Sequence, residues 1–342
     1  MRALVVVVFP DKLVEETFSM FTSDTDTHPV KLADIPLMWR LTDRVTVLDS
    51  ELGYTRDIYK PNGAVLSSVL LPQRSLHTLV ARSDTQQVVG QFRLHDNDDH
   101  AHIVYLAPHL EDQDQDDVWL HLLDAMARKA GKHNVRSLVA EVDENSHLFE
   151  TMRSAGYSVY ARQQIWRHLP GDYVSTRRKI NLTKETESDG LKIQSLIART
   201  VPPIVQQIIG PPVDLNGWVY RQNDKVEGYV AVSEGKYGIY LIPCFHPDVM
   251  EDLEDIICTL VQKMTDIDKL PLYVCVRRYQ KWIALALENM RFEPGPRQAV
   301  MVKHIAARVR HAEFEITHPV KAAVKSVKTS SNSYKSKTGN RN

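Results

Sequence analysis

The sequence has few cysteines, no long apolar run and almost no net charge. Its three cysteines form no CxxC pair, which argues against a disulfide framework and favours packed thiols in a reducing compartment. A formal net charge of −1 over 342 residues excludes a chain-wide attraction to nucleic acid or to acidic membranes. The early apolar run Ala3–Phe9 is too short to cross a membrane and has no signal-peptide cleavage pattern beside it. We therefore expect a cytoplasmic protein in which this run forms a buried strand of an N-terminal extension, residues 1–29.

The composition is that of a globular protein with two domains. Apolar residues make up 43% and charged residues 25% of the chain, and 342 residues exceed what one ordinary core organises. The charge is unevenly distributed, because six basic and no acidic residues follow Glu315. Segment 317–342 lacks apolar periodicity and cannot bury enough surface to order itself. We expect a disordered basic tail there, solvated rather than bound to nucleic acid, since it has no arginine-rich block and few aromatic residues.

Two parts of the chain read alike at a constant offset. Val104–Pro108 and Ile239–Pro243 are apolar runs that end in proline, and an acidic stretch and an amphipathic helical pattern follow each of them. The two prolines lie 135 positions apart, and the upstream match continues at an offset of 138. The sequence therefore predicts two copies of one α/β unit, with generic strand–helix–strand spacing as the alternative explanation. The further matching pairs are Leu138–Val142 with Tyr273–Arg277, Gly156-Tyr157 with Arg291-Phe292, and Val88–Leu94 with Val226–Val232.

Each copy is predicted to open with a short helix. The sequence places these helices at Ile35–Leu41 and Leu191–Ala198. Asp34 and Asp189 precede them, and a carboxylate at that position accepts hydrogen bonds from free amides of the first turn. We expect both aspartates to cap their helices.

A turn signal separates the two copies. Pro170-Gly171-Asp172 interrupts the periodic pattern between them. We therefore expect a first domain at 30–170 and a second at 176–310, each with its own mixed sheet.

The repeated unit resembles the GNAT family of acetyl-CoA-dependent N-acyltransferases, in a tandem arrangement. In that family a strand ends in a Val/Leu-x-Pro element, as Leu106-Ala107-Pro108 and Leu241-Ile242-Pro243 do here. The segment from Asn145 to Tyr157 resembles the later helix of the family and its Gly-Phe/Tyr ending. The resemblance covers 30–168 and 176–307. It implies two tandem GNAT-like domains of the α/β class (an α+β mixed sheet), with acetyl-CoA as the acyl donor.

The resemblance also implies candidate site residues. In the family, the pantetheine arm of the cofactor lies between two strands that splay apart, and loop amides at the next helix start hold the diphosphate. Glu141 lies in a strand that would flank the acyl group and is the candidate general base; a carboxylate on the rim of the site is the alternative. Core packing is the alternative for the two tyrosines among the cofactor candidates. The candidate cofactor-binding residues are Tyr105, Leu106, Asn145, Tyr240, Leu241 and Ile242.

Both copies depart from the family pattern at the diphosphate loop. Glycine lets backbone amides approach a diphosphate, whereas Glu111–Asp117 and Met250–Asp255 are acidic. Acids stabilise a helix start but repel a diphosphate. Met152 and Leu287 stand where the family often has a proton-donating tyrosine.

Two functions are consistent with this pattern. One is an N-acyltransferase that moves an acetyl or acyl group from acyl-CoA to a small-molecule or protein amine. The other is a catalytically lapsed tandem protein that binds a small ligand or a protein partner in the old cleft. The sequence indicates neither the acceptor, nor the oligomeric state, nor the copy that acts.

A histidine-rich stretch is a further candidate site. His100 and His102 would share one face of a strand, which suits paired imidazole ligands of a metal. The preceding Asp96-Asn97-Asp98-Asp99 is a strong turn signal between two strands. We therefore expect a hairpin here and no metal.

Overall fold

The computed structural model describes residues 25–41, 44–56, 75–94, 99–110, 116–171, 178, 180–208, 217–264 and 269–305, which all belong to one compact unit. The strand expected at Ala3–Phe9, most of the first acidic loop and the tail expected at 317–342 lie outside the described residues. Within the described ranges, no helix is long and apolar enough to cross a membrane.

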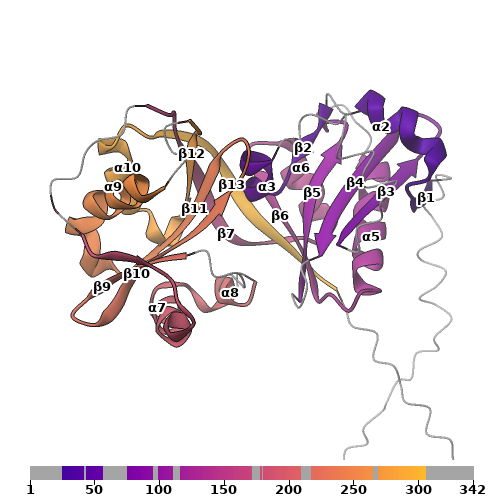
Figure 1. The fold of residues 1–342 in the computed structure, drawn as a ribbon. Coiled ribbons are helices and arrows are strands. Elements are labelled where there is room, and N and C mark those ends of the chain that lie inside the picture. The colour runs from indigo at the N-terminus through magenta and orange to yellow at the C-terminus, as the bar shows by residue number, and fades with distance from the viewer. Residues whose placement is uncertain are drawn as a thin grey trace, which may run out of the picture. The chain divides into compact units, whose positions relative to one another are not determined.

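The first half of the fold runs from β1 to β7 (Figure 1). Strand β1, three short helical segments and the two-residue strand β2 precede β3 in the described residues. The elements are β1 (Asp26–Pro29), η1 (Leu32–Asp34), α2 (Ile35–Leu41), β2 (Thr46–Val47), α3 (Ser50–Thr55), β3 (Leu76–Arg82), β4 (Gln87–Leu94), β5 (His100–Ala107), α5 (Asp116–Gly131), β6 (Ser137–Asp143), α6 (His147–Ser154) and β7 (Ser158–His168).

The second half runs from β8 to β13 and repeats this order. Its elements are β8 (Leu182–Lys184), η3 (Glu187–Asp189), α7 (Gly190–Thr200), α8 (Pro203–Gln206), β9 (Gly217–Gln222), β10 (Lys225–Glu234), β11 (Ile239–Phe245), η4 (Pro247–Asp252), α9 (Leu253–Lys263), β12 (Leu272–Arg277), η5 (Arg278–Gln280), α10 (Ile283–Asn289) and β13 (Glu293–His304).

The repeat predicted from the sequence is confirmed. Ser137 begins β6 and Leu272 begins β12, and Ser158 begins β7 and Glu293 begins β13; both pairs lie 135 positions apart. The predicted opening helices are also present, as α2 and as the central part of α7. The expected hairpin between β4 and β5 forms an antiparallel pair on either side of its turn.

The prediction that each half carries its own sheet is wrong, because the two halves share one mixed sheet. Its strand order is β1-β3-β4-β5-β6-β13-β7-β12-β11-β10-β9-β8, with β2 paired to β5. The last strand of each half therefore crosses over. β13 pairs antiparallel with β6, where Val300 lies opposite Glu141, and β7 pairs with β12, where Trp166 lies opposite Val274 (Figure 1). β7 and β13 also pair with each other and join the halves.

Helices cover both faces of the sheet in each half (Figure 1). In the first half, α5 buries Trp119 and Leu122 in one core, while α2 and α3 bury Leu37 and Leu52 in another. In the second half, α9 and α10 lie in one core and α7 in another. Each fully buried apolar side chain stabilises the fold by about 1.5–3 kcal/mol, so the helical apolar stripes fix this layered arrangement.

The two capping aspartates act one turn earlier than expected. Asp34 accepts a hydrogen bond from Lys31 N at 2.8 Å, and Asp189 accepts one from Thr186 N at 3.1 Å. Each carboxylate thus closes the 3-10 turn that leads into its helix. An arginine pairs with each buried carboxylate, Arg82 in the first half and Arg221 in the second.

Candidate functional site

In the first half, β5 and β6 pair for only a short distance before they diverge. His100–His102 lie beside Ser137–Val139 in parallel register. Beyond them β5 continues for five residues and ends at Ala107, which is joined to Pro108 by a cis peptide bond. The divergence is the feature that the family resemblance predicts for the pantetheine arm.

Backbone of the same chain lies between the diverging parts of β5 and β6. Thr46 and Val47 of β2 pair with Leu106 and Tyr105 of β5. Leu48 N then donates to Val104 O at 2.9 Å, and Glu141 N donates to Leu48 O at 2.8 Å. Segment 46–48 therefore bridges β5 and β6, and the candidate residues Tyr105 and Leu106 have their backbone paired with it.

Glu141 supports the helix that follows this segment. Its Oε2 accepts a hydrogen bond from Ser50 N at 2.9 Å, while the N-cap residue Asp49 accepts one from Leu52 N at 3.1 Å. Arg93 pairs with Asp49 at 2.7 Å. Burial raises the pKa of Asp49, and the nearby guanidinium of Arg93 opposes that shift. In this structure, the candidate base is thus an acceptor for a free amide at the start of α3.

The second half closes the same position in a different way. Ile239–Leu241 of β11 are the counterparts of Val104–Leu106, but they pair directly with Leu272–Val274 of β12. Tyr240 and Leu241 are buried there, each 2% exposed. β12 is thus displaced along β11 relative to the first half, and the two strands diverge only beyond Leu241.

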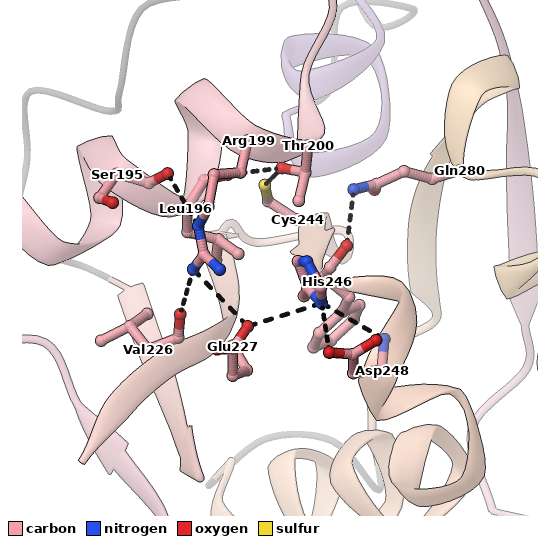
Figure 2. Close-up of polar contacts among 11 residues, drawn as sticks. Ser195, Leu196, Arg199, Thr200, Val226, Glu227, Cys244, His246, Asp248 and Gln280 are labelled. Carbon is pink, nitrogen blue, oxygen red and sulfur yellow. Dashed lines mark hydrogen bonds and ion pairs between the residues drawn. The ribbon is translucent and has the colours of Figure 1, made fainter. Parts of the chain in front are cut away.

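The side chain of Gln280 lies at the strand edge beyond Leu241. The amide of Gln280 lies against the backbone of β11 (Figure 2). In the orientation that satisfies both groups, its nitrogen donates to Pro243 O at 3.0 Å and its oxygen accepts from Phe245 N at 3.2 Å. Gln280 therefore forms the two hydrogen bonds that a peptide of a neighbouring strand would form. Its counterpart Asn145 is exposed, and Asn145 N donates to Asp143 Oδ1 at 2.9 Å.

A charged cluster adjoins this edge. Figure 2 shows the carboxylate of Glu227 between Arg199 and His246, with Oε2 at 3.6 Å from Arg199 Nη2 and 3.7 Å from His246 Nδ1. Thr200 lies 3.2 Å from the thiol of Cys244, whose pKa is raised by burial. The cluster places a histidine and a buried carboxylate at the end of β11.

The second acidic loop is helical. Its first part is the 3-10 helix η4, whose N-cap is His246, and α9 begins at Leu253, which is fully buried. Asp252 accepts from Arg178 at 2.7 Å and from Tyr220 at 3.0 Å, and Glu254 accepts from Asn289 at 2.7 Å. Two of the acids are therefore engaged with neighbours, and Leu253 serves the core at the position where the family has a glycine.

The histidine-rich stretch lies on β5. His100 Nδ1 lies 2.6 Å from Ser137 Oγ, at the start of the β5–β6 pair. Among the described residues, no group of three or more histidines, cysteines or carboxylates is arranged to hold a metal ion.

The sequence does not match any protein-family model or curated protein. Solved structures do match the fold. A GCN5-related N-acetyltransferase from Sphaerobacter thermophilus matches with a TM-score of 0.50 at 11% identity, over 82% of this chain and 96% of its own. A tandem GNAT protein from the clavulanic acid biosynthesis pathway matches with a TM-score of 0.44 at 15% identity, over 82% and 99%. The chain thus has the fold of the GNAT acetyltransferases, in a tandem arrangement whose halves exchange their last strands.

Proposed function

We propose that this protein is a GNAT-type N-acyltransferase that binds acyl-CoA in its second half and acylates an amine. The fold supports this proposal, and the contact of Gln280 with β11 carries it. In the first half, backbone of the same chain bridges β5 and β6. In the second half, one side-chain amide holds the strand edge. A side chain can rotate away and yield its place to the amides of a pantetheine arm, whereas segment 46–48 cannot leave without breaking β2.

The residues of the second half have distinct tasks in this proposal. Pro243 O and Phe245 N would bind the cofactor amide, and Tyr240, Leu241 and Ile242 would line the cleft. The cofactor supplies an acyl group activated as a thioester. A thiolate is a fair leaving group near neutral pH, so the absence of a donating tyrosine at Leu287 is compatible with transfer. A role for Glu141 as general base stays a prediction.

The second candidate function is a lapsed acyltransferase that binds a small ligand or a protein partner without turnover. The closure of the first half by β2 favours it. So does the acidic start of α9, because Glu254 and Asp255 place negative charge where a diphosphate would lie. This candidate predicts no acyl transfer to any amine.

Calorimetry of the full chain with acetyl-CoA tests the proposal. We expect binding that becomes about tenfold tighter in Gln280→Ala, because the cofactor no longer competes with two hydrogen bonds worth about 1.4 kcal/mol in total. Asn145→Ala, the matched change in the first half, should leave the affinity unchanged. Thermal unfolding checks that both variants are folded.

Two outcomes contradict the proposal. Absence of acetyl-CoA binding by the folded protein and by Gln280→Ala, even at low salt, would exclude acyl-CoA as the donor. Binding without release of free CoA in the presence of a broad panel of amines would favour the lapsed protein.

A further inference from the structure

Arg277 is a buried cation with an incomplete set of partners. It is the last residue of β12 and is 7% exposed. Its Nε and Nη1 atoms have no hydrogen-bond partner among the residues that the structure describes. A guanidinium stays charged in a protein interior, and an unpaired buried charge costs several kcal/mol. Buried charges are therefore normally paired with a protein group or a ligand.

The neighbouring polar groups are engaged with one another. The Cys275 thiol donates to Gln163 Oε1 at 3.4 Å, Gln163 donates to Gln298 Oε1 at 3.2 Å, and Ser50 Oγ donates to the same oxygen at 3.2 Å. This row crosses the shared sheet beside Arg277, which lies opposite Gln163 in the β12–β7 pair. The row consists of thiol, amide and hydroxyl groups, so it offers Arg277 no carboxylate.

Glu141 is a carboxylate that interacts electrostatically with Arg277. Burial opposes the charged form of Arg277, but Cys275, Tyr279, Glu141 and Tyr240 favour it and together raise the pKa of the guanidinium. However, Glu141 Oε2 accepts a hydrogen bond from Ser50 N. Glu141 and Arg277 form no ion pair among the described residues. Glu141 therefore lowers the cost of burying Arg277 without occupying its free N–H groups.

The position of Arg277 connects it with the proposed cleft. Burial raises the pKa of Tyr240 and of Cys244, two residues of β11, and the guanidinium of Arg277 opposes both shifts. β12 and β11 stop pairing after Val274 and Leu241, and Gln280 contacts β11 three residues beyond Arg277. Arg277 thus lies where the two strands diverge, beside the proposed cleft.

We propose that Arg277 binds a carboxylate of the acceptor, so that the substrate is an amine that also carries a carboxylate, as an amino acid does. This inference rests on the proposed function and names its substrate class. A single negative charge matches the single charge of the Arg277 guanidinium. A phosphate would bring a second charge toward Glu141 and is disfavoured. Charge-assisted hydrogen bonds to the free N–H groups would also orient the amine.

The test compares amines with and without the carboxylate. The full chain is titrated with L-amino acids and with the corresponding amino-acid amides, in the absence of acetyl-CoA. We expect at least one amino acid to bind about tenfold or more tightly than its amide, since a charge-assisted pair contributes about 1.5–3 kcal/mol. Arg277→Met should abolish the difference, whereas Arg278→Met, at an exposed neighbouring position, should preserve it. Arg277→Lys keeps the charge and should retain part of the preference if the methionine variant does not fold.

The result separates this inference from the proposed function. Equal affinity for acids and amides in the unmodified protein, or a preference that survives in folded Arg277→Met, would overturn the carboxylate site. Acetyl-CoA binding is measured separately, in the unmodified protein. A carboxylate preference in a protein that binds no acetyl-CoA would leave the site standing and remove the transferase.

Discussion

Arg291 has a backbone conformation that suits glycine. Its φ of 65° lies in the left-handed region, as does the φ of 86° at its counterpart Gly156. Both residues follow the last turn of a helix, α10 and α6. Glycine is favoured at this position because it has no Cβ to crowd the following carbonyl. The second half therefore keeps the geometry of the first without its preferred residue.

Arg291→Gly should stabilise the protein by about 0.5–1 kcal/mol, because glycine relieves the left-handed strain at an exposed position. Urea unfolding of the full chain measures the change. Glu288→Gly, inside α10 and also exposed, is the matched control and should destabilise by up to about 1 kcal/mol. An equal decrease in the free energy of unfolding in the two variants would contradict the interpretation.

At this scale the sequence predicts counterparts but not contacts. Alignment of the halves relates Gln280 to Asn145. Nothing in the pattern indicates that Gln280 contacts the backbone of β11 whereas Asn145 is exposed. Arg277 carries a signal, since a charged residue ends an otherwise apolar strand. That its Nε and Nη1 atoms have no hydrogen-bond partner among the described residues depends on packing between strands from both halves. For Glu141 the sequence predicts a place near the acyl site, and the structure shows its contact with Ser50.

At the scale of elements, β2 is too short to be predicted. Two paired residues leave no periodicity, and their role follows from the hydrogen bonds of Leu48 to β5 and β6. The longer elements were predictable because α5 and α9 have sustained apolar stripes and β6 and β12 are continuous apolar runs. The crossing of β7 and β13 could not be predicted from the sequence. Both strands have the same position in the repeat, so each could pair with the strands of either half.

Leu48→Pro should destabilise the protein more than Leu48→Ala. Both variants lose the packing of a side chain that is 2% exposed, at a cost of about 2–4 kcal/mol. Only proline also removes the amide that donates to Val104 O, which should add about 1–3 kcal/mol. Chemical denaturation compares the two, and equal stabilities would show that the bridging segment contributes little.

At the scale of the whole molecule, each half depends on a strand from the other. β13 buries Ala299, Val300, Met301 and Val302 between β6 and β7. Their burial contributes several kcal/mol, comparable to the whole stability of a typical domain of about 5–15 kcal/mol. We therefore expect β13 to be required for the stability of the first half.

Truncation after Phe292 tests this dependence. We expect the shortened chain to lose amide hydrogen-exchange protection in β6, Ser137–Asp143, because its partner strand is missing. A chain that ends at Ala307 retains β13 and is the matched control. Protection of β6 in both truncated chains would show that the first half is stable by itself.

The crossed strands also set an order in time. A ribosome completes β6 at Asp143 and reaches β13 only at Glu293. At about 5–20 residues per second, that interval lasts roughly 8–30 s. During this interval the edge of β6 that later pairs with β13 is unpaired, and other chains could pair with it. We therefore expect β6 to keep this unpaired edge until β13 has been synthesised, so that the sheet of the first half is completed only after the other strands of the second half have been made.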